Sequence, residues 1–217
     1  MDCLIARLVI GLLALVALLG PTAALAEDKV AVLSTSFVLK KKFKLLEAAA
    51  GRAGVPFAWT YVENGEPAVR KALEGARFVI VDAPRSDDSA VVNGAAGHIL
   101  AGLGVASVQI SVMNRAARMK PLGIESAIAQ RVFDYYVAGT AINHDRLFAY
   151  LKAFMAGDDL APVPPPIEML NGGIYHGGYD QSLFATLPDY LTWWERRKGE
   201  PRGNRPVIGM EISSSYI

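Results

Sequence analysis

Four short apolar runs that alternate with helical stretches constrain the fold of the first half of this chain. The runs are rich in β-branched and aromatic residues and cover 29–34, 57–62, 78–81 and 106–112. The intervening stretches have helical periodicity or lie between glycines, which predicts helices over 37–53, 67–73 and 89–103. Such an alternation is typical of a parallel sheet joined by right-handed crossovers, so the sequence predicts an α/β fold.

The first and third runs indicate which kind of sheet to expect. No G-x-G-x-x-G motif follows 29–34, so a flavodoxin-like open parallel sheet is preferred to the dinucleotide-binding arrangement. The run 78–81 (FVIV) is continuously apolar, which is typical of a strand covered on both faces. We therefore predict a flavodoxin-like α/β domain over 27–113.

An apolar leader precedes this domain. Arg7 gives a basic start, 8–19 is apolar, and 24–26 (ALA) forms a small-x-small cleavage site, so residues 1–26 are expected to be a signal peptide. The apolar run is short for a bilayer span, and a retained membrane anchor is the alternative. Cleavage would remove Cys3 and leave a periplasmic or secreted chain without cysteine.

Beyond residue 113 the pattern becomes helical. Helices are expected over 125–137 and from an N-cap at Asn143 to Gly157, which gives a helical extension over 114–160. The run 161–166 (APVPPP) can be neither a helix nor a central strand. It is expected to be an extended spacer, with a ligand for an SH3-type domain as the alternative.

The last part of the chain is interpreted as a linker with an aromatic helix, followed by an incomplete domain. Residues 161–204 hold the proline- and glycine-containing linker and a helix over 183–198. The run 206–212 (PVIGMEI) predicts a new strand, so 205–217 is interpreted as the start of a truncated next domain. The basic residues 196–198 complement the helix dipole. The net charge of +1 gives no attraction to nucleic acid, and no nucleic-acid partner is expected.

Ser34, Thr35 and Ser36 form the first candidate binding site. They lie at the carboxyl end of the first predicted strand and just before a helix, where open α/β sheets bind phosphates. A cap for the following helix is the simpler interpretation, because no glycine opens the loop. Asp82 follows the third run and is either a turn-former or a general base or Mg²⁺ ligand.

The histidines form the second group of candidates. His98 has no carboxylate or histidine at helical spacing, and His144 precedes a predicted helix, so both are expected to have local roles. His176, with Tyr175, lies in a glycine-flanked loop that would allow the backbone to approach a ligand. A hydrogen-bonded pin of that loop is the alternative. The sequence contains no motif of a Ser/His/Asp catalytic triad, no Walker phosphate-binding loop and no spacing of zinc ligands. No catalytic residue and no metal ligand is therefore assigned.

The loop around His176 also carries a resemblance to a known family. The residues 173–176 (GIYH), Phe184 and 189–193 (DYLTW) are similar to the G-x-Y-H-P…F…E-Y-L-x-W segment of the large tetrapyrrole metal-chelatase subunits. These are the CobN-type cobaltochelatase subunit and the H subunit of magnesium chelatase. Gly177 stands where the family has proline.

Two further segments extend the resemblance over most of 29–217. The stretch 133–140 (FDYYVAGT), with Asn143 and 147–151, resembles the family's A-Y-x-Y-x-x-x-G-G-x-x-N…L segment, with Thr140 in place of the second glycine. The residues 205–209 (RPVIG) and 215–216 (SY) resemble the P-x-V-G…R-S-Y strand that opens the next domain of the family.

The resemblance implies a function in tetrapyrrole metal chemistry. The family inserts cobalt or magnesium into a tetrapyrrole as a nitrogen–metal bond-forming ligase, as in cobalamin biosynthesis, with ATP hydrolysed by AAA+ partner subunits. Its metal- and macrocycle-handling residues lie downstream of the matched part. This chain is therefore expected to be an N-terminal fragment with a scaffold role, inactive alone and without a cofactor of its own. Its partners would be the rest of the chelatase chain and, in the cytoplasm, the AAA+ subunits.

The leader favours a second interpretation. An exported chain cannot meet ATP-driven cytoplasmic subunits, so metal removal or tetrapyrrole binding without ATP would replace insertion. In this case the chain is an exported, non-catalytic module that binds a tetrapyrrole or a partner protein. A flavodoxin-like electron carrier with bound flavin is a third, minor interpretation.

Overall fold

The structure is a computed structural model that describes residues 28–114, 117–168, 173–176, 178–179 and 183–198. The predicted signal peptide (1–26) and the predicted strand and truncated domain (205–217) lie outside the described residues. Within the described part, none of the helices combines the length and the apolar character that crossing a bilayer requires.

The centre of the molecule is a five-stranded sheet in the order β2-β1-β3-β4-β5. The strands are β1 (Lys29–Ser34), β2 (Phe57–Tyr61), β3 (Ala76–Asp82), β4 (Ala106–Ile110) and β5 (Met119–Leu122). The first four are parallel, and β5 pairs antiparallel with β4. This is the strand order of flavodoxin-like sheets. The predicted α/β fold with an open, mostly parallel sheet is confirmed.

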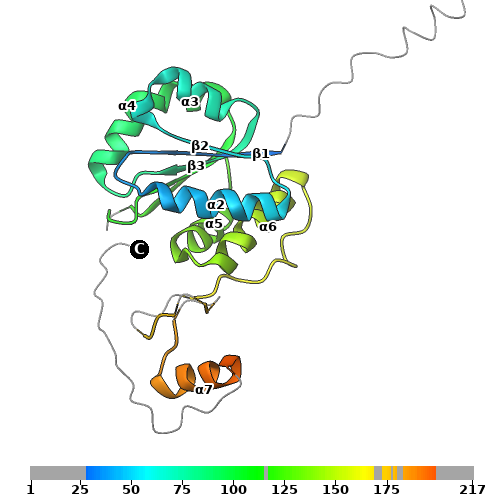
Figure 1. The fold of residues 1–217 in the computed structure, drawn as a ribbon. Helices are drawn as coiled ribbons and strands as arrows, with labels where there is room; N and C mark the ends of the chain where they lie inside the picture. The colour runs from blue at the N-terminus through cyan, green and yellow to red at the C-terminus, as the bar shows by residue number, and fades with distance from the viewer. Residues whose placement is uncertain (1–27, 115–116, 169–172, 177, 180–182, 199–217) are drawn as a thin grey trace, which may run out of the picture.

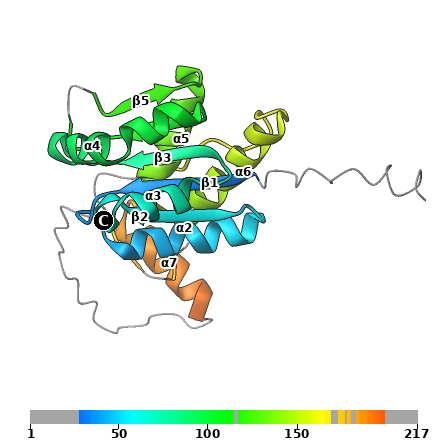
Figure 2. The same cartoon turned by 90° about the horizontal axis from the view of Figure 1, so that it is seen from above.

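Helices cover both faces of this sheet, as Figures 1 and 2 show. One face carries α2 (Lys40–Ala53), α5 (Ser126–Ala138) and α6 (Ala141–Ala156), and the other carries α3 (Glu66–Leu73) and α4 (Ser86–Leu103). A short 3-10 helix, η1 (Val62–Asn64), joins β2 to α3. We call the described residues of 28–156 the α/β sandwich.

Alternating side chains of the strands divide the core between the two faces. In β1, Val30 and Val32 pack with α2, α5 and α6, whereas Ala31 and Leu33 pack with α3 and α4. All four side chains are fully buried, which explains why the strand sequences are almost continuously apolar. Burial of each large apolar side chain contributes about 1.5–3 kcal/mol relative to leaving it exposed.

Two local predictions after residue 113 are wrong. Asn143 is not the N-cap of α6, because Thr140 occupies that position and its hydroxyl accepts the Asn143 backbone N–H at 3.1 Å. The sequence predicts only helices there, yet residues 119–122 (MKPL) form the edge strand β5. The two helices themselves are present as α5 and α6, and Gly157 ends α6 in the left-handed conformation, with φ of 76°.

The chain then leaves the sandwich and forms a small aromatic unit. Residues 174 and 184 pair in an isolated antiparallel bridge, and α7 (Leu187–Lys198) follows. A Cβ on Gly173 would lie 2.5 Å from the carbonyl oxygen of Phe184, so the bridge requires glycine there. We call the described residues of 173–197 the C-terminal aromatic segment.

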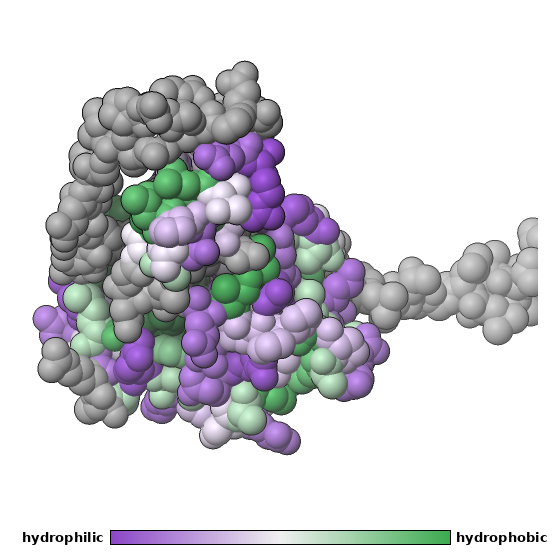
Figure 3. Space-filling view, turned by 90° about the horizontal axis from the view of Figure 1, so that it is seen from below, coloured by the Kyte–Doolittle hydropathy of each residue, from purple (hydrophilic) through white to green (hydrophobic). Residues whose placement is uncertain are grey.

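Figure 3 shows one face of the molecule coloured by hydropathy, on which apolar side chains form small patches among polar ones.

Candidate functional site

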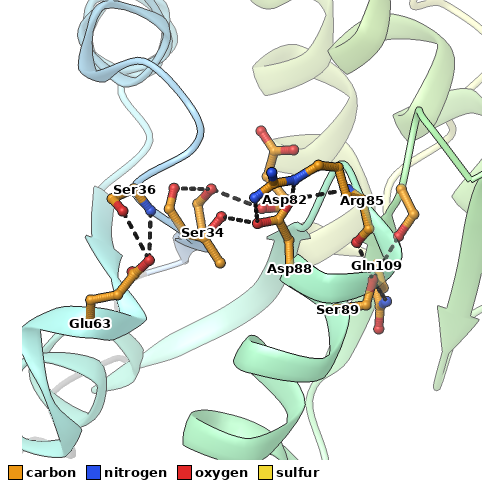
Figure 4. Close-up of polar contacts among 10 residues, drawn as sticks. Ser34, Ser36, Glu63, Asp82, Arg85, Asp88, Ser89 and Gln109 are labelled. Carbon is orange, nitrogen blue, oxygen red and sulfur yellow. Dashed lines mark hydrogen bonds and ion pairs between the residues drawn. The ribbon is translucent and has the colours of Figure 1, made fainter.

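The carboxyl ends of the parallel strands bring together polar side chains that are far apart in the sequence. Ser34 ends β1 and Ser36 follows it, Glu63 follows β2, and Asp82 ends β3 (Figure 4). Arg85, just beyond β3, precedes α4. Open α/β sheets bind ligands at this edge because the loops there diverge and helix N-termini point towards it.

The buried centre of this edge is the carboxylate of Asp82. It is 1% exposed, and its Oδ2 accepts hydrogen bonds from Lys42 Nζ and from the Tyr136 hydroxyl, both at 2.8 Å. The Lys42 ammonium also lies 3.9 Å from the centroid of the Tyr136 ring. Burial, and then the charge of Asp82, raises the pKa of Tyr136 well above its usual value, so the phenol remains a proton donor. In this arrangement Asp82 ties β3 to α2 and α5.

A second buried carboxylate organises the start of α4. Asp88 accepts the Thr35 hydroxyl at Oδ1 (2.9 Å) and the Arg85 guanidinium at both oxygens (2.8 Å each). It also accepts the Arg85 backbone N–H at 3.1 Å, which completes a capping box. The hydrogen bond from the Arg85 side chain is the largest cause that lowers the pKa of Asp88. The guanidinium lies 3.8 Å from the centroid of the Phe37 ring.

The three residues of the predicted site, Ser34–Ser36, lie at this edge, and their side chains have different surroundings. Ser34 is buried, and its hydroxyl donates to the Asp82 carbonyl at 2.8 Å. Thr35 is buried with Asp88. Ser36 is exposed, and both its N–H (2.9 Å) and its hydroxyl (3.1 Å) donate to Glu63 Oε1. Of the three, only Ser36 is therefore open to a ligand.

Ser36 lies between a carboxylate and the lysine-rich first turn of α2. The first turn of α2 contains lysines and no acidic residue, and its N-cap, Leu39, makes no side-chain capping hydrogen bond. Lys40 and Lys41 are exposed there. Positive charge at a helix N-terminus adds to the helix dipole. The Glu63 carboxylate, however, accepts both donors of Ser36, so the charges at this corner are of mixed sign.

Sequence reasoning missed most partners at this edge. Glu63 directly follows a predicted strand, as Asp82 does, and that position is the signal that could have identified it. Lys42 and Tyr136 contact Asp82 across sequence separations of 40 and 54 residues, and no sequence pattern indicates those contacts.

The other predicted site residues, Tyr175 and His176, lie in the C-terminal aromatic segment. His176 Nδ1 accepts the Gly178 N–H at 3.0 Å, and its ring centroid lies 4.8 Å from that of Trp193. The histidine thus pins its own loop to α7. Tyr175 is 71% exposed. The structure places these two residues apart from the cluster at the sheet edge, in a different unit of the fold.

An open groove of about 540 Å³ runs along this segment. The aromatic side chains Tyr179, Phe184 and Trp193 line it together with Asp189 and Arg196. The Tyr179 and Phe184 rings stack with centroids 3.8 Å apart, and Trp193 lies 5.2 Å from Phe184. The groove therefore offers aromatic surface between one acidic and one basic side chain.

The remaining histidines differ in burial. The His98 side chain is 59% exposed and lies 4.0 Å from Glu66 Oε1. His144 is 2% exposed, its Nε2 has no hydrogen-bond partner, and burial lowers its pKa to about 4. Across the part of the chain that the structure describes, no cluster of three or more His, Cys, Asp or Glu side chains could hold a metal ion.

Comparison with known proteins gives one informative match. No protein-family model and no curated protein matches the sequence. Among solved structures, the chain is similar to the catalytic subunit of cobaltochelatase from Mycobacterium tuberculosis, with a TM-score of 0.50 and 19% sequence identity. The match covers 70% of this chain and 12% of that much longer one. At this identity the likeness concerns the fold: the chain shares its α/β architecture with a part of that subunit.

Proposed function

We propose that this chain is a scaffold part of a CobN-like cobaltochelatase subunit, in a protein that inserts or removes a metal ion in a tetrapyrrole. The observation that carries the proposal is the structural likeness to the cobaltochelatase catalytic subunit over 70% of this chain. The order of the GIYH, Phe184 and DYLTW motifs, which resembles the same family, supports it independently. The proposal concerns one part of a machine, since the match covers 12% of the larger protein.

A scaffold role agrees with how the polar groups of the sheet edge are used. Asp82 holds Lys42 and Tyr136, and Asp88 holds Thr35 and Arg85. Both carboxylates are almost fully buried and already hydrogen-bonded, so they stabilise the positions of α2, α4 and α5. The metal and the tetrapyrrole would be handled by other parts of the complete protein.

A chimera tests this proposal. The segment of the Mycobacterium tuberculosis subunit that matches this chain is replaced by the matching residues of this chain, and cobalt insertion is measured with the partner subunits present. We expect the chimera to retain measurable insertion, whereas a deletion of the segment abolishes it. A control chimera carrying Asp82→Ala should lose activity with its fold. A folded chimera that is as inactive as the deletion would contradict the scaffold role.

The groove of the C-terminal aromatic segment favours a second candidate, a tetrapyrrole-binding module. Tyr179, Phe184 and Trp193 offer ring faces and edges that can stack on a planar macrocycle, and Arg196 can pair with a carboxylate substituent. Binding of this kind needs neither ATP nor a bound metal, which suits an exported chain.

Titration of the purified chain with a water-soluble free-base porphyrin tests this candidate. We expect quenching of tryptophan fluorescence, with the affinity at least tenfold weaker in Trp193→Ala. Trp59→Phe is the matched control, because Trp59 lies in the sandwich, 4.5 Å from the Phe43 ring. Equal affinity in all three proteins would place binding elsewhere and exclude the groove.

We also propose that the chain is exported and that its leader is removed. The support is the basic, apolar and small-residue order of 1–26. Amino-terminal sequencing of the protein from cell fractions tests this, with a mature start at Glu27 in the periplasmic or secreted fraction as the expected result. A protein that keeps Met1 or remains with the membrane would favour the anchor instead.

A further inference from the structure

The proline-rich spacer is held by side chains of α5 and α6. The Tyr135 hydroxyl donates to the Pro164 carbonyl at 2.7 Å, and Arg146 Nη1 donates to the Pro165 carbonyl. The Asn143 amide bonds the backbone of Ile167 twice: Nδ2 donates to its carbonyl at 2.9 Å, and Oδ1 accepts its N–H at 2.8 Å. The spacer is therefore docked on the sandwich over 164–167.

The chemistry of the two surfaces is complementary. A proline has a carbonyl acceptor and no N–H donor, so a proline run presents only acceptors. The helical face meets Pro164 and Pro165 with donors, a phenol and a guanidinium. The acceptor on this face, Asn143 Oδ1, accepts the N–H of Ile167, the first residue after the prolines.

The groups that bind the spacer are held in place by the helices. Tyr135 and Asn143 are fully buried, and Asn143 lies in the first turn of α6, which Thr140 caps. Leu160 and Val163 are partly buried against the same core, so the spacer has apolar anchors before its hydrogen bonds begin. A site preorganised in this way loses little conformational entropy when it binds.

We propose that the α5–α6 face is a binding site for a proline-rich peptide, and that the chain's own residues 163–167 fill it. The site takes an apolar side chain at the position of Val163 and backbone carbonyls at the positions of Pro164 and Pro165. At the position of Ile167 it requires a residue that has a backbone N–H. By holding Ile167, it also fixes where the C-terminal aromatic segment leaves the sandwich. The spacer is thus a ligand in cis, and an added peptide of the same sequence binds once the spacer is released.

The test uses the full chain with a spacer whose own binding is weakened. The variant carries Ile167→Pro, which removes the backbone N–H that Asn143 Oδ1 accepts. It also carries Pro164→Gly, Pro165→Ser and Pro166→Gly, which raise the entropy lost on docking, and it keeps all the side chains of the α5–α6 face. The probe is a fluorescein-labelled peptide of residues 161–168 (APVPPPIE), followed by fluorescence anisotropy. We expect at least tenfold tighter binding to this variant than to the wild type, because the tethered spacer competes at an effective concentration of about millimolar.

Two controls show which contacts are responsible. Asn143→Ala, added to the spacer variant, should weaken peptide binding at least tenfold. A peptide with proline at the position of Ile167 has no N–H for Asn143 Oδ1 and should also bind at least tenfold more weakly. Equal peptide affinity for the wild type and the spacer variant, or no effect of Asn143→Ala, overturns the proposal.

A measurement on the unmodified protein decides the matter if the spacer variant does not fold. The Ile167 amide hydrogen should exchange at least tenfold more slowly in the full chain than in the free peptide, because Asn143 accepts it. Exchange of this amide at the rate of the free peptide overturns the proposal without any variant.

Discussion

The α/β sandwich and the C-terminal aromatic segment are stabilised in different ways. The sandwich buries apolar side chains on two faces of a sheet, and its edge contains buried, hydrogen-bonded carboxylates. In the C-terminal aromatic segment only Phe184 is buried among the described residues, and its other rings are partly exposed. A two-faced core unfolds as a unit, whereas a one-sided aromatic cluster can open locally. The two regions should therefore respond differently to substitution.

The largest effect is expected from Asp82→Ala in the sandwich. Without the carboxylate, the Lys42 ammonium and the buried Tyr136 hydroxyl lose their shared acceptor. Tyr136 is fully buried and the Lys42 side chain is 31% exposed, so leaving both unpaired should cost about 3 kcal/mol of unfolding free energy, the low end of the range for a broken buried pair. Urea denaturation followed by far-UV circular dichroism measures this change. A loss below about 1 kcal/mol would show that the edge is not a stabilising part of the sandwich.

The next effect concerns pH and His144. Burial lowers the pKa of His144 to about 4 in the folded chain, and its value in an unfolded chain is about 6.5. As the pH falls from about 6.5 to 4, the unfolded chain takes up a proton that the folded chain does not, so stability falls by roughly 3 kcal/mol. Urea titrations across this window should show that slope in the wild type and a flatter one in His144→Leu. Identical slopes would contradict the burial of a neutral imidazole.

A smaller effect on global stability is expected from Phe184→Ala in the C-terminal aromatic segment. The ring stacks on Tyr179 and contacts Tyr190 and Trp193, so its loss should release that segment. Because the segment lies outside the core of the sandwich, the free energy of unfolding should change by at most about 1 kcal/mol. Limited proteolysis and tryptophan fluorescence report the local release. Tyr175→Ala, at an exposed ring, is the control. Unfolding of the whole chain would show that the two regions form one cooperative unit.

The smallest effect is expected from Asp145→Ala. Its carboxylate pairs with Arg52 at 2.6 Å, and the two side chains are 47% and 55% exposed. Surface pairs of this kind contribute about 0.2–1 kcal/mol, and salt screens them. Urea denaturation at low and at high salt measures both quantities. A loss as large as that of Asp82→Ala would remove the distinction between buried and exposed charge pairs.

The sequence predicts the parallel part of the fold well because its signal is local. The run FVIV indicates a strand covered on both faces, and β3 is such a strand. The edge strand β5 has no such signal, because MKPL contains a lysine and a proline and is only partly buried. The site is less predictable. The position of Ser34–Ser36 follows from the end of β1, but Asn143 is a docking residue instead of a cap because Ile167, far along the chain, supplies its partner.

Pro121, at the outer strand of the sheet, has a consequence for self-association. The Ser111 N–H donates to the Arg118 carbonyl, and hydrogen-bonded pairs alternate along an antiparallel ladder, so Val108 and Pro121 form a non-bonded pair. The nitrogen of Pro121 therefore faces the free side of β5, where proline has no hydrogen to offer an incoming strand. A sixth strand from another molecule would miss that contact. This border of the sheet therefore resists edge-to-edge aggregation.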